Sequence, residues 1–486
     1  MHPLATNMLT PTRDVYRFGF ESAGALEITN EYSGLAVTPA HLYCFRRSQA
    51  CMSHNFNLAY WGTVMGNEQE EPFTAYVGID WADTKHDVCI RPLDAEASEF
   101  DVIAHQVEKI DEWVHDLHHR FGGRIAIAVE LSKGPIVSAL QKYDFIVIYP
   151  IHPSTLAKYR ETFTPSRAKD DPTDAELAVD LLLRHPDHFK PLQPQSVEMR
   201  ALATMVEHRR QLVDEKTRVT NRLRSALKQY YPQALEWFDH IDTLLFCDFL
   251  TRWPTLIQAK RARVTTLRRF FGQHNMYREG VLKRRLDSIK GSVPLTSDDA
   301  IITPYQLQAL MLTGQLRLML QSIKEFDEEI ESIASKHPDY ALFRALPGAG
   351  PSLAPRLLVA FGEQRDRFRS AEDLQKYSGV APVTERSGKK HWVHWRWQCP
   401  TFLRQTFVEW AGQTINKSYW AGQYYYQQRE KGCTYQAAVR SLAFKWIRIL
   451  YRCWQTGKVY DEAVYLKALE RRGSPLLARP IVQESA

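Results

Sequence analysis

Cysteine is scarce in this 486-residue chain, and the cysteines that are present form no recognisable pattern. There are seven of them, an odd number, and no two stand in a C-x-x-C pair. This spacing argues against a zinc site and against a disulfide framework, and it fits a reducing compartment. The seven residues are Cys44, Cys51, Cys89, Cys247, Cys399, Cys433 and Cys453.

Long hydrophobic runs and a leader sequence are also missing. No apolar stretch approaches the roughly 20 residues that cross a bilayer. The first thirty residues lack a basic start followed by an apolar segment and a cleavage site. Hydrophobic residues make up 44% and charged residues 24% of the chain, which is typical of an ordinary globular protein. We therefore expect a cytoplasmic protein with no membrane partner and roughly two to four domains.

The positive charge is concentrated in two segments. The net charge is only +6. The segment from Val197 to Tyr231 contains eight Lys and Arg residues and four Asp and Glu residues. The segment from Thr251 to Lys290 contains eleven Lys and Arg residues and two Asp and Glu residues. Basic segments of this kind indicate a polyanionic partner, although a solvated helix surface is the alternative for either one.

Residues 1–72 show no clear periodicity. Either the true translation start lies at Met52 or Met65, or a small extra domain precedes the rest. Residues 75–190 are predicted to form a mixed α/β unit with the element order βββαβαβα, which begins with the strand Ala75–Asp80 and has its fourth strand at Arg124–Glu130. This order is the topology of the RNase H-like fold.

The rest of the chain is predicted to be mainly helical. Apolar residues recur at helical spacing over about 196–232 and 304–336, and within region 196–336 these two helices could pair as an antiparallel coiled coil. Residues 340–465 form a third unit, followed by a tail at 466–486. This unit opens with Leu346-Pro-Gly-Ala-Gly-Pro351, which is typical of a helix-hairpin-helix turn. Gly348 and Gly350 would expose backbone N–H groups to a DNA phosphate, and a plain turn is the alternative.

Four carboxylates lie at the ends of predicted elements. Asp80 ends the first strand and Glu130 ends the fourth, and these strands are neighbours in an RNase H-like sheet. Asp171 and Asp174 are three residues apart, a spacing that puts both on one face of a helix. Four carboxylates together would repel one another unless a cation lay among them, and Mg²⁺ prefers such oxygen ligands. Two such ions can stabilise both the attacking and the leaving oxygen of a phosphoryl transfer.

Each acid also has a competing explanation. Asp80 could be a turn residue. The segment Asp171-Pro-Thr-Asp174 is a good helix start, with Asp171 as N-cap, Pro next and an acid at the third helical position. Asp170 is a second candidate for the ligand role of Asp171. Glu130 is harder to explain structurally, because it follows six largely apolar residues and a charge there faces burial.

Two sets of motifs occur in order along the chain. The first contains an Asp, a Glu and a D-x-x-D followed by Ala. It consists of Val77-Gly-Ile-Asp80-Trp, Val129-Glu130 and Lys169-Asp-Asp171-Pro-Thr-Asp174-Ala175. The second set lies in the C-terminal unit and consists of Leu346–Pro351, Phe368-Arg-Ser370, Tyr377-Ser-Gly-Val-Ala-Pro382 and Ser387-Gly388. With these motifs, residues from about 75 to 465 resemble the DEDD transposases of the insertion-sequence-110 family, relatives of the pilin-gene invertases.

The resemblance implies a RuvC-like domain, a coiled coil and a helical transposase domain. It also implies a serine nucleophile that forms a covalent phosphoserine link to DNA, and Ser387 is the matching position. Mg²⁺ held by the four carboxylates could activate this serine if the two domains meet, for instance across a dimer. From its surroundings alone, Ser387 could equally belong to a basic exposed turn.

The resemblance further implies a structured guide RNA and a homodimer or tetramer. Arg218, Arg222 and Arg224 on the basic helix are candidates for binding that RNA. Near Ser387, the basic residues Arg386, Lys389, Lys390, Arg396 and Arg404 could neutralise DNA phosphates. Trp392, Trp395 and Trp397 alternate among them, and core packing is favoured over base stacking.

The predicted function is that of a transposase or site-specific recombinase. A metal-dependent nuclease of the junction-resolvase type, in which water attacks DNA, is the first alternative. An inactive protein that only binds nucleic acid is the second.

Overall fold

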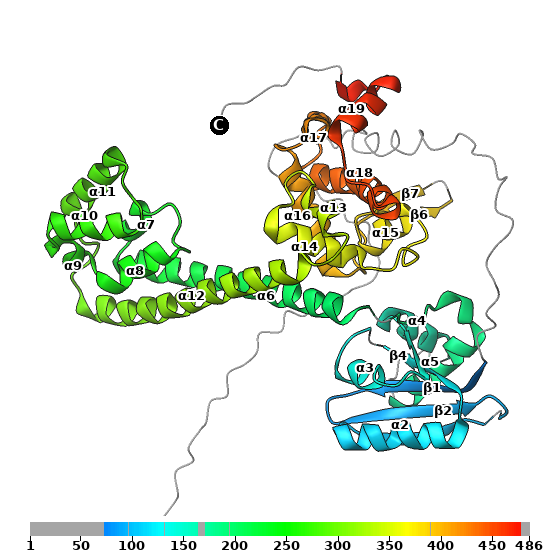
Figure 1. Cartoon of the computed structure of the whole chain (residues 1–486). Helices are drawn as coiled ribbons and strands as arrows, with labels where there is room; N and C mark the ends of the chain where they lie inside the picture. The colour runs from blue at the N-terminus through cyan, green and yellow to red at the C-terminus, as the bar shows by residue number, and fades with distance from the viewer. Residues whose placement is uncertain are drawn as a thin grey trace, which may run out of the picture.

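The structure is a computed structural model that describes residues 72–477, apart from 96, 131, 164–170, 194 and 389. The interpretations of residues 1–71, Asp170 and Lys389 therefore lie outside the described residues. Within them the chain forms a mixed α/β sheet unit followed by a mostly helical body, as predicted (Figure 1).

The sheet has five strands in the order β3-β2-β1-β4-β5. Its strands are β1 (Phe73–Trp81), β2 (Lys85–Pro92), β3 (Glu99–Ala104), β4 (Arg124–Val129) and β5 (Ile146–Pro150). The pairs β1–β2 and β2–β3 are antiparallel, whereas β1–β4 and β4–β5 are parallel. The predicted order of strands and helices is confirmed, and the parallel pairs place the C-terminal ends of β1, β4 and β5 at one edge.

Helices cover both faces of this sheet. One face packs on α2 (Val107–Phe121) and α3 (Pro135–Leu140), around a core of branched aliphatic side chains. The amphipathic helix α2 turns Ile110, Trp113, Val114 and Leu117 inward. The other face packs on α5 (Asp171–Arg184), which is flanked by α4 (Pro153–Phe163). The end of the sheet where β1 and β4 finish is thus next to the start of α5.

The closest contact between α5 and the sheet is made at Gly78 in the middle of β1. A Cβ atom at this position would lie 2.0 Å from the carbonyl oxygen of Ala175 and 2.9 Å from Val179 Cγ2. Only glycine therefore allows the backbone of α5 to approach β1 this closely. This contact sets the height of α5 above the sheet.

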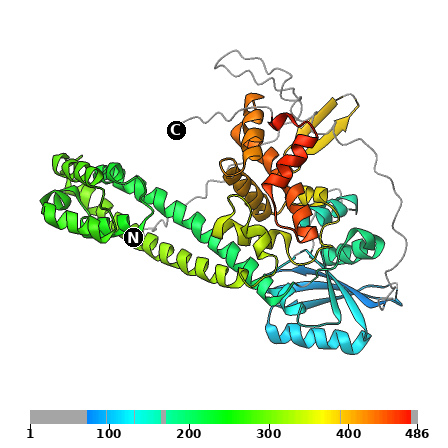
Figure 2. The ribbon, with the colours of Figure 1, turned by 45° about the horizontal axis from the view of Figure 1, so that its top comes forward.

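Two long helices form the spine of the helical body. Helix α6 (Val197–Tyr230) starts at the N-cap Ser196, whose hydroxyl accepts a hydrogen bond from the Met199 N–H. Helix α12 (Asp299–Ala334) lies along it in the opposite direction (Figures 1 and 2). The Arg209 guanidinium in the first half of α6 pairs with Asp327 in the last half of α12, at 2.5 Å.

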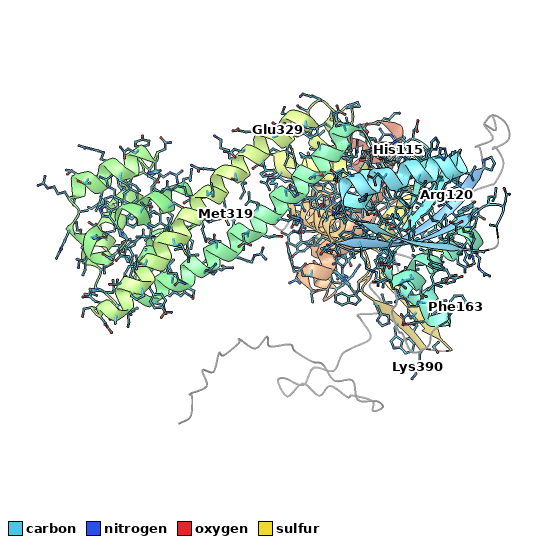
Figure 3. The ribbon with its side chains drawn as sticks, turned by 90° about the horizontal axis from the view of Figure 1, so that it is seen from below. His115, Arg120, Phe163, Met319, Glu329 and Lys390 are labelled. Atoms are coloured by element: carbon cyan, nitrogen blue, oxygen red, sulfur yellow. The ribbon has the colours of Figure 1, made fainter. Side chains whose placement is uncertain are left out.

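The second long helix starts five residues earlier than its predicted start at 304. Asp298 caps it by accepting a hydrogen bond from the Ala300 N–H, and Pro304 is accommodated inside the helix. Proline lacks an N–H and so costs one backbone hydrogen bond there. In Figure 3, the side chains of Met319 and Glu329 mark the course of α12 between the two ends of the molecule.

A helical cluster occupies the far end of this spine (Figure 1). It consists of α7 (Gln233–Trp237), α8 (Leu244–Arg252), α9 (Leu256–Arg261), α10 (Val264–Gln273) and α11 (Glu279–Gly291). Aromatic residues fill its core, with Phe249 at the centre and Trp253, Phe270 and Phe271 around it. The same core includes Leu223 of α6 and Leu316 of α12, so the cluster and the spine are packed together.

The C-terminal unit is built on the opposite end of the spine. Its helices are α13 (Tyr340–Arg344), α14 (Gly350–Phe361), α15 (Ala371–Tyr377), α16 (Thr401–Thr414), α17 (Tyr419–Glu430), α18 (Tyr435–Thr456) and α19 (Glu462–Arg471). The hairpin of β6 (Val383–Ser387) and β7 (Lys390–His394) projects from it. Its core includes the fully buried Trp410, Trp420 and Trp446. The last helix runs past the expected end at residue 465, to Arg471.

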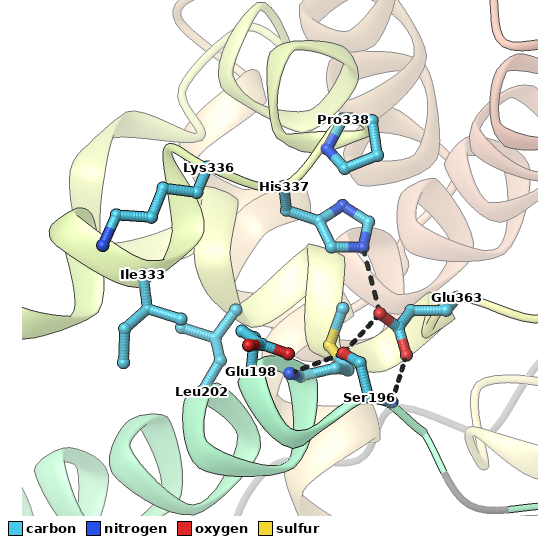
Figure 4. A pocket seen from close by; sticks show the side chains of 9 residues that line it. Ser196, Glu198, Leu202, Ile333, Lys336, His337, Pro338 and Glu363 are labelled. Atoms are coloured by element: carbon cyan, nitrogen blue, oxygen red, sulfur yellow. Dashed lines mark hydrogen bonds and ion pairs between the residues drawn. The ribbon is translucent and has the colours of Figure 1, made fainter.

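Glu363, just after α14, joins the spine to the C-terminal unit. Its carboxylate accepts hydrogen bonds from the N–H and the hydroxyl of Ser196, at 2.7 and 2.6 Å, and lies 3.6 Å from the imidazole of His337 (Figure 4). It therefore bridges the start of α6 and the end of α12. None of the described helices is long and apolar enough to span a membrane.

Replacing Gly78 with alanine tests the close approach of α5. The new methyl group would meet a backbone carbonyl, which cannot rotate away, so the strand and the helix must separate. We expect Gly78→Ala to reduce the free energy of unfolding of the sheet unit by about 1–3 kcal/mol. Thermal unfolding together with hydrogen exchange of α5 peptides measures this loss.

Gly314→Ala is the matched control, because Gly314 is an exposed glycine inside α12 with no atom near its Cβ position. Alanine at an open helical position stabilises by about 0.5–1 kcal/mol. If the two variants had the same stability, Gly78 would not determine how closely α5 packs.

Candidate functional site

The sheet register brings Asp80 and Glu130 to the same place. Gly78 pairs with Ala128 across the parallel strands, and both residues face α5. Side chains alternate along a strand, so Asp80, two residues after Gly78, faces α5 as well. Glu130 stands two residues after Ala128 and directly follows β4. Both carboxylates are half-buried, and neighbouring strands lie about 4.8 Å apart.

The acids of α5 belong to its first turn, over this end of the sheet. Helix α5 begins at Asp171, which is half-buried, and Asp174 is almost fully buried with 1% of its side chain exposed. Asp174 immediately precedes Ala175, the residue in contact with Gly78.

Arg160 on α4 neutralises Asp174. Its Nε donates to Asp174 Oδ1 at 2.5 Å, and 13% of the arginine side chain is exposed. A buried carboxylate needs such a partner because its desolvation is costly. Arg160 belongs to no sequence motif, and only the packing of α4 on α5 identifies it.

Asp87 is a further acid that the motifs did not identify. It pairs with Asp80 across the antiparallel strands and is buried, with 5% exposed. Like charges directly opposite each other destabilise a sheet. Lys85 offsets this repulsion, with Nζ 3.0 Å from the Asp87 carboxylate. In the sequence, Asp87 and Cys89 alternate with the apolar Val88 and Ile90. This alternation points to Asp87 as a site residue only once the β1–β2 register is known.

The spacing of these acids limits how they could bind a metal. Among the residues that the structure describes, no three His, Cys, Asp or Glu side chains are close enough together to hold one ion. Coordination by the four predicted ligands would therefore require side-chain rotation, and Asp174 would have to share its carboxylate with Arg160. The structure thus brings the acids to one end of one face of the sheet without assembling a closed ligand set.

Ser387 belongs to a different part of the molecule. It is the last residue of β6, pairs with Lys390 and is exposed at the tip of the hairpin. Gly388 continues the turn with φ +55°, a value that favours glycine. Arg386 and Lys390 are exposed beside the serine, and Figure 3 shows Lys390 away from the helical body. The hairpin and the sheet are separate units in Figures 1 and 2.

The expected core packing of the hairpin tryptophans is wrong for two of the three. Trp397 is 79% exposed and Trp392 is 42% exposed. Trp395 is half-buried, and its ring contacts two guanidinium groups. A two-stranded hairpin lacks a second layer to cover its faces, so Trp392 in β7 remains at the surface, and Trp397 lies in the segment that follows β7.

The two predicted phosphate-binding glycines have different surroundings. Gly348 has φ +72°, and a Cβ there would lie 2.9 Å from the carbonyl oxygen of Gln413 in α16. Its glycine requirement is therefore explained by internal packing. Gly350 has φ +56° and starts α14, with open space where a Cβ would be. Of the two, Gly350 is the better candidate for a phosphate contact.

The predicted RNA-binding arginines are all exposed on α6. Arg218 pairs with Glu215 at 2.6 Å, and Arg224 donates to the Asn221 side chain. Arg222 lies between them in the sequence and is also exposed. Helix α6 turns Val219 and Leu223 into the core, so its opposite side presents these charges to solvent. This surface can bind a polyanion.

Removing the guanidinium from Arg160 should destabilise the sheet unit. In Arg160→Gln the buried Asp174 loses the cation that faces it, and breaking a buried pair in this way costs about 3 kcal/mol. Faster hydrogen exchange in α4 and α5, together with a lower unfolding temperature, would measure the effect.

Arg184→Gln provides the comparison on the same helix. Arg184 pairs with Asp180 at 2.7 Å, but its side chain is 66% exposed. An exposed pair contributes less than about 1 kcal/mol. Equal losses in the two variants would mean that burial does not strengthen the Arg160–Asp174 pair.

Comparisons with known proteins match both parts of the candidate site. A family model for IS110-type DEDD transposases, described as "Transposase", matches residues 77–232, which include all four acids. A second model, "Transposase IS116/IS110/IS902 family", matches residues 340–427, which include Ser387 and the glycine turn.

Full-length relatives agree with the two models. The "Mini-circle putative transposase for IS117" of Streptomyces coelicolor is 30% identical over 419 residues, 84% of this chain and 99% of the relative. The "Putative transposase y4uE" of Sinorhizobium fredii is 30% identical over 42% of this chain and 57% of its own length. The "Insertion element IS110 uncharacterized 43.6 kDa protein" of Streptomyces coelicolor is 26% identical, with coverage of 61% and 73%. This chain therefore belongs to the IS110/IS116 family of transposases, enzymes that act on DNA.

Proposed function

We propose that this transposase cuts and rejoins DNA with Ser387 as the nucleophile, assisted by a carboxylate cluster on the sheet. The observation that carries the proposal is the β1–β4 register, which puts Asp80 and Glu130 side by side on the face where α5 starts. Asp171 and Asp174 of that first turn complete the set of four. The exposed Ser387, on a basic hairpin in a separate unit, supplies the hydroxyl.

The sheet unit belongs in this proposal to the RNase H-like, RuvC-like class. Its strand order β3-β2-β1-β4-β5, with two antiparallel pairs followed by two parallel pairs, supports the assignment. The α6–α12 pair acts as a coiled coil that connects the sheet unit and the C-terminal unit with the distal helical cluster. Its support is the antiparallel packing of two helices of 34 and 36 residues.

The donor chemistry of the four acids fits Mg²⁺. Carboxylate oxygens are its preferred protein ligands, and the half-buried positions of Asp80, Glu130 and Asp171 leave room for water and phosphate. Asp80, Glu130, Asp171 and Asp174 would hold the metal. Bound Mg²⁺ would supply charge stabilisation at the phosphate oxygens during DNA cleavage.

The proposed chemical step exchanges one phosphodiester for another. The Oγ atom of Ser387 attacks the phosphorus of the scissile bond and loses its proton. The bond from phosphorus to one deoxyribose oxygen breaks, and that oxygen leaves as a hydroxyl. Because the phosphoserine link conserves the ester, the reverse step can join a different DNA strand without ATP.

The hairpin and the carboxylates must meet for this step to occur. A homodimer or tetramer provides a simple arrangement, in which the hairpin of one subunit reaches the sheet of another. The exposed arginines of α6 (Arg218, Arg222 and Arg224) bind a structured guide RNA in the same proposal. In this proposal the DNA is contacted by the glycine turn and by four basic residues, Arg386, Lys389, Lys390 and Arg404.

A covalent adduct tests the serine. The full-length protein is incubated with labelled DNA ends of its element, the guide RNA and Mg²⁺, and the products are separated under denaturing conditions. We expect a protein–DNA adduct for the natural chain and none for Ser387→Ala. Thr384→Ala is the control, since Thr384 is an exposed hydroxyl on the same strand, and it should form the adduct normally.

The alternatives give different products in this assay. Strand cleavage that persists in Ser387→Ala would identify a metal-dependent nuclease that uses water. DNA binding by the natural chain without cleavage would identify an inactive binding protein.

Asp171→Asn separates the metal role of Asp171 from a capping role. Asparagine retains the ability to cap a helix but removes the negative charge. Loss of a second-shell partner already costs 10–100-fold, so loss of a ligand should lower the adduct rate by at least about 100-fold. Asp101→Asn on the outer strand β3 is the control. Full activity of Asp171→Asn would exclude Asp171 from the site.

Metal binding can be measured without any reaction. Saturating Mg²⁺ should raise the melting temperature of the sheet unit by about 2–4 °C, because the metal offsets carboxylate repulsion. The increase should vanish in Asp80→Asn and persist in Asp101→Asn. If neither Mg²⁺ nor Mn²⁺ changed the melting temperature of the natural chain, this result would contradict the proposed ligand set.

A further inference from the structure

Trp395 lies between the hairpin and two helices, and two arginines contact its ring. The guanidinium carbon of Arg440, on α18, is 3.3 Å from the ring centre. That of Arg404, on α16, is 5.2 Å from the same centre. Both arginines are half-buried. One indole thus holds two cations from different helices in place.

These two charges have no acidic partner in the part of the chain that the structure describes. Arg404 donates to the carbonyl oxygen of Arg396 at 3.3 Å, and neither arginine forms an ion pair with Asp or Glu. Burial, with the nearby charge of Arg404, lowers the pKa of Arg440 to about 10. Two partly desolvated positive charges without a counter-ion are costly, and a bound anion would remove that cost.

The arginine pair is attached firmly to the base of the hairpin. Gly379, before β6, packs so tightly on Cys399, after β7, that a Cβ would lie 2.2 Å from its Sγ. The Nε of Arg396 donates to the Ala381 carbonyl oxygen at 3.4 Å. Trp395 directly follows β7, whose other end pairs with Ser387. The arginines and the serine therefore lie at opposite ends of one short, anchored ribbon.

We propose that Arg404 and Arg440 together bind one phosphate of the DNA backbone. Guanidinium groups match phosphate geometry, and the contact with Trp395 holds both in position before DNA arrives. The exposed Trp397 lies beside Trp395, with ring centres 6.3 Å apart, and offers flat apolar surface to the same strand. DNA is the ligand because the ribbon leads from the arginines to the residue proposed to attack DNA.

The geometry also gives a spacing, and both this spacing and the choice of DNA as the ligand rest on the proposed role of Ser387. Five residues separate Lys390, opposite Ser387, from Trp395, which corresponds to about 17 Å along a strand. At a rise of about 3.4 Å per nucleotide, the bound phosphate lies about five nucleotides from the scissile bond.

Salt-dependent binding tests the arginine pair. The affinity of the full chain for a labelled random-sequence DNA duplex is measured by fluorescence anisotropy over a range of salt concentrations. We expect Arg404→Gln and Arg440→Gln each to weaken binding about tenfold and to reduce the salt slope by about one. The double variant should reduce the slope by about one as well, because both side chains contact the same phosphate.

Arg452→Gln is the control, since Arg452 is an exposed arginine further along α18. Arg440→Lys keeps the charge but not the planar group, so it should retain the slope and lose affinity. If Arg440→Gln melts early, Arg404→Gln and Arg440→Lys still decide the question. The proposal would be overturned if Arg404→Gln and Arg440→Gln had the same salt slope as Arg452→Gln. It would also be overturned if these variants lost affinity only for an RNA duplex.

A neutral methylphosphonate placed at successive positions tests the spacing. The neutral group should weaken DNA binding by the natural chain most when it stands about five nucleotides from the cleaved bond. At that position it should cause no further loss of affinity in Arg404→Gln. If Ser387 is not the nucleophile, Ser387→Ala will not abolish a protein–DNA adduct that the natural chain forms. The DNA affinities measured by anisotropy do not depend on that outcome. The two proposals therefore fail independently.

Discussion

The contact between Gly78 and the backbone of Ala175 is the constraint on which the candidate site depends. It brings α5 onto β1 without an intervening side chain, and this closeness puts the first turn of α5 over the end of the sheet. Asp174 is buried because it precedes the contact residue, and Asp80 faces it because it lies two residues beyond Gly78. A larger residue at position 78 would lift the helix and separate the two groups of acids.

Burial creates an electrostatic problem that the surrounding residues solve in pairs. Arg160 pairs with the buried Asp174, and Lys85 pairs with the buried Asp87. Asp80, Glu130 and Asp171 are half-buried and lie nearer to solvent than Asp87 and Asp174. The arginine pair near the hairpin is arranged in the opposite way, because its charges have no acidic neighbours among the described residues. Around Trp395, two arginines are held together by an aromatic ring and lack acids. The protein thus keeps negative charge compensated at the sheet and positive charge uncompensated at the hairpin.

The helical spine explains how such different surfaces coexist in one chain. Helices α6 and α12 contribute to two separate cores, one with the distal cluster and one with the C-terminal unit. Glu363 ties the start of one helix to the end of the other. The basic arginines of α6 stand on the part of that helix that packs into the distal core, beside Val219 and Leu223. The sheet unit joins the spine at the end where the hairpin unit is built.

The sequence by itself determined the order of strands and helices and the family membership suggested by its motifs, and it supplied four acids and one serine as candidates for the site. These features are local or follow from short periodic patterns, so residues such as Asp80 and Glu130 can be assigned to strand ends directly. Only the tertiary structure decided which face each acid occupies, that Asp87 lies opposite Asp80, and that Arg160 pairs with Asp174. It also corrected the environment of Trp392 and Trp397 and brought Arg440 beside Arg404. These facts depend on strand register and on contacts between residues far apart in the chain, for which local periodicity carries no signal.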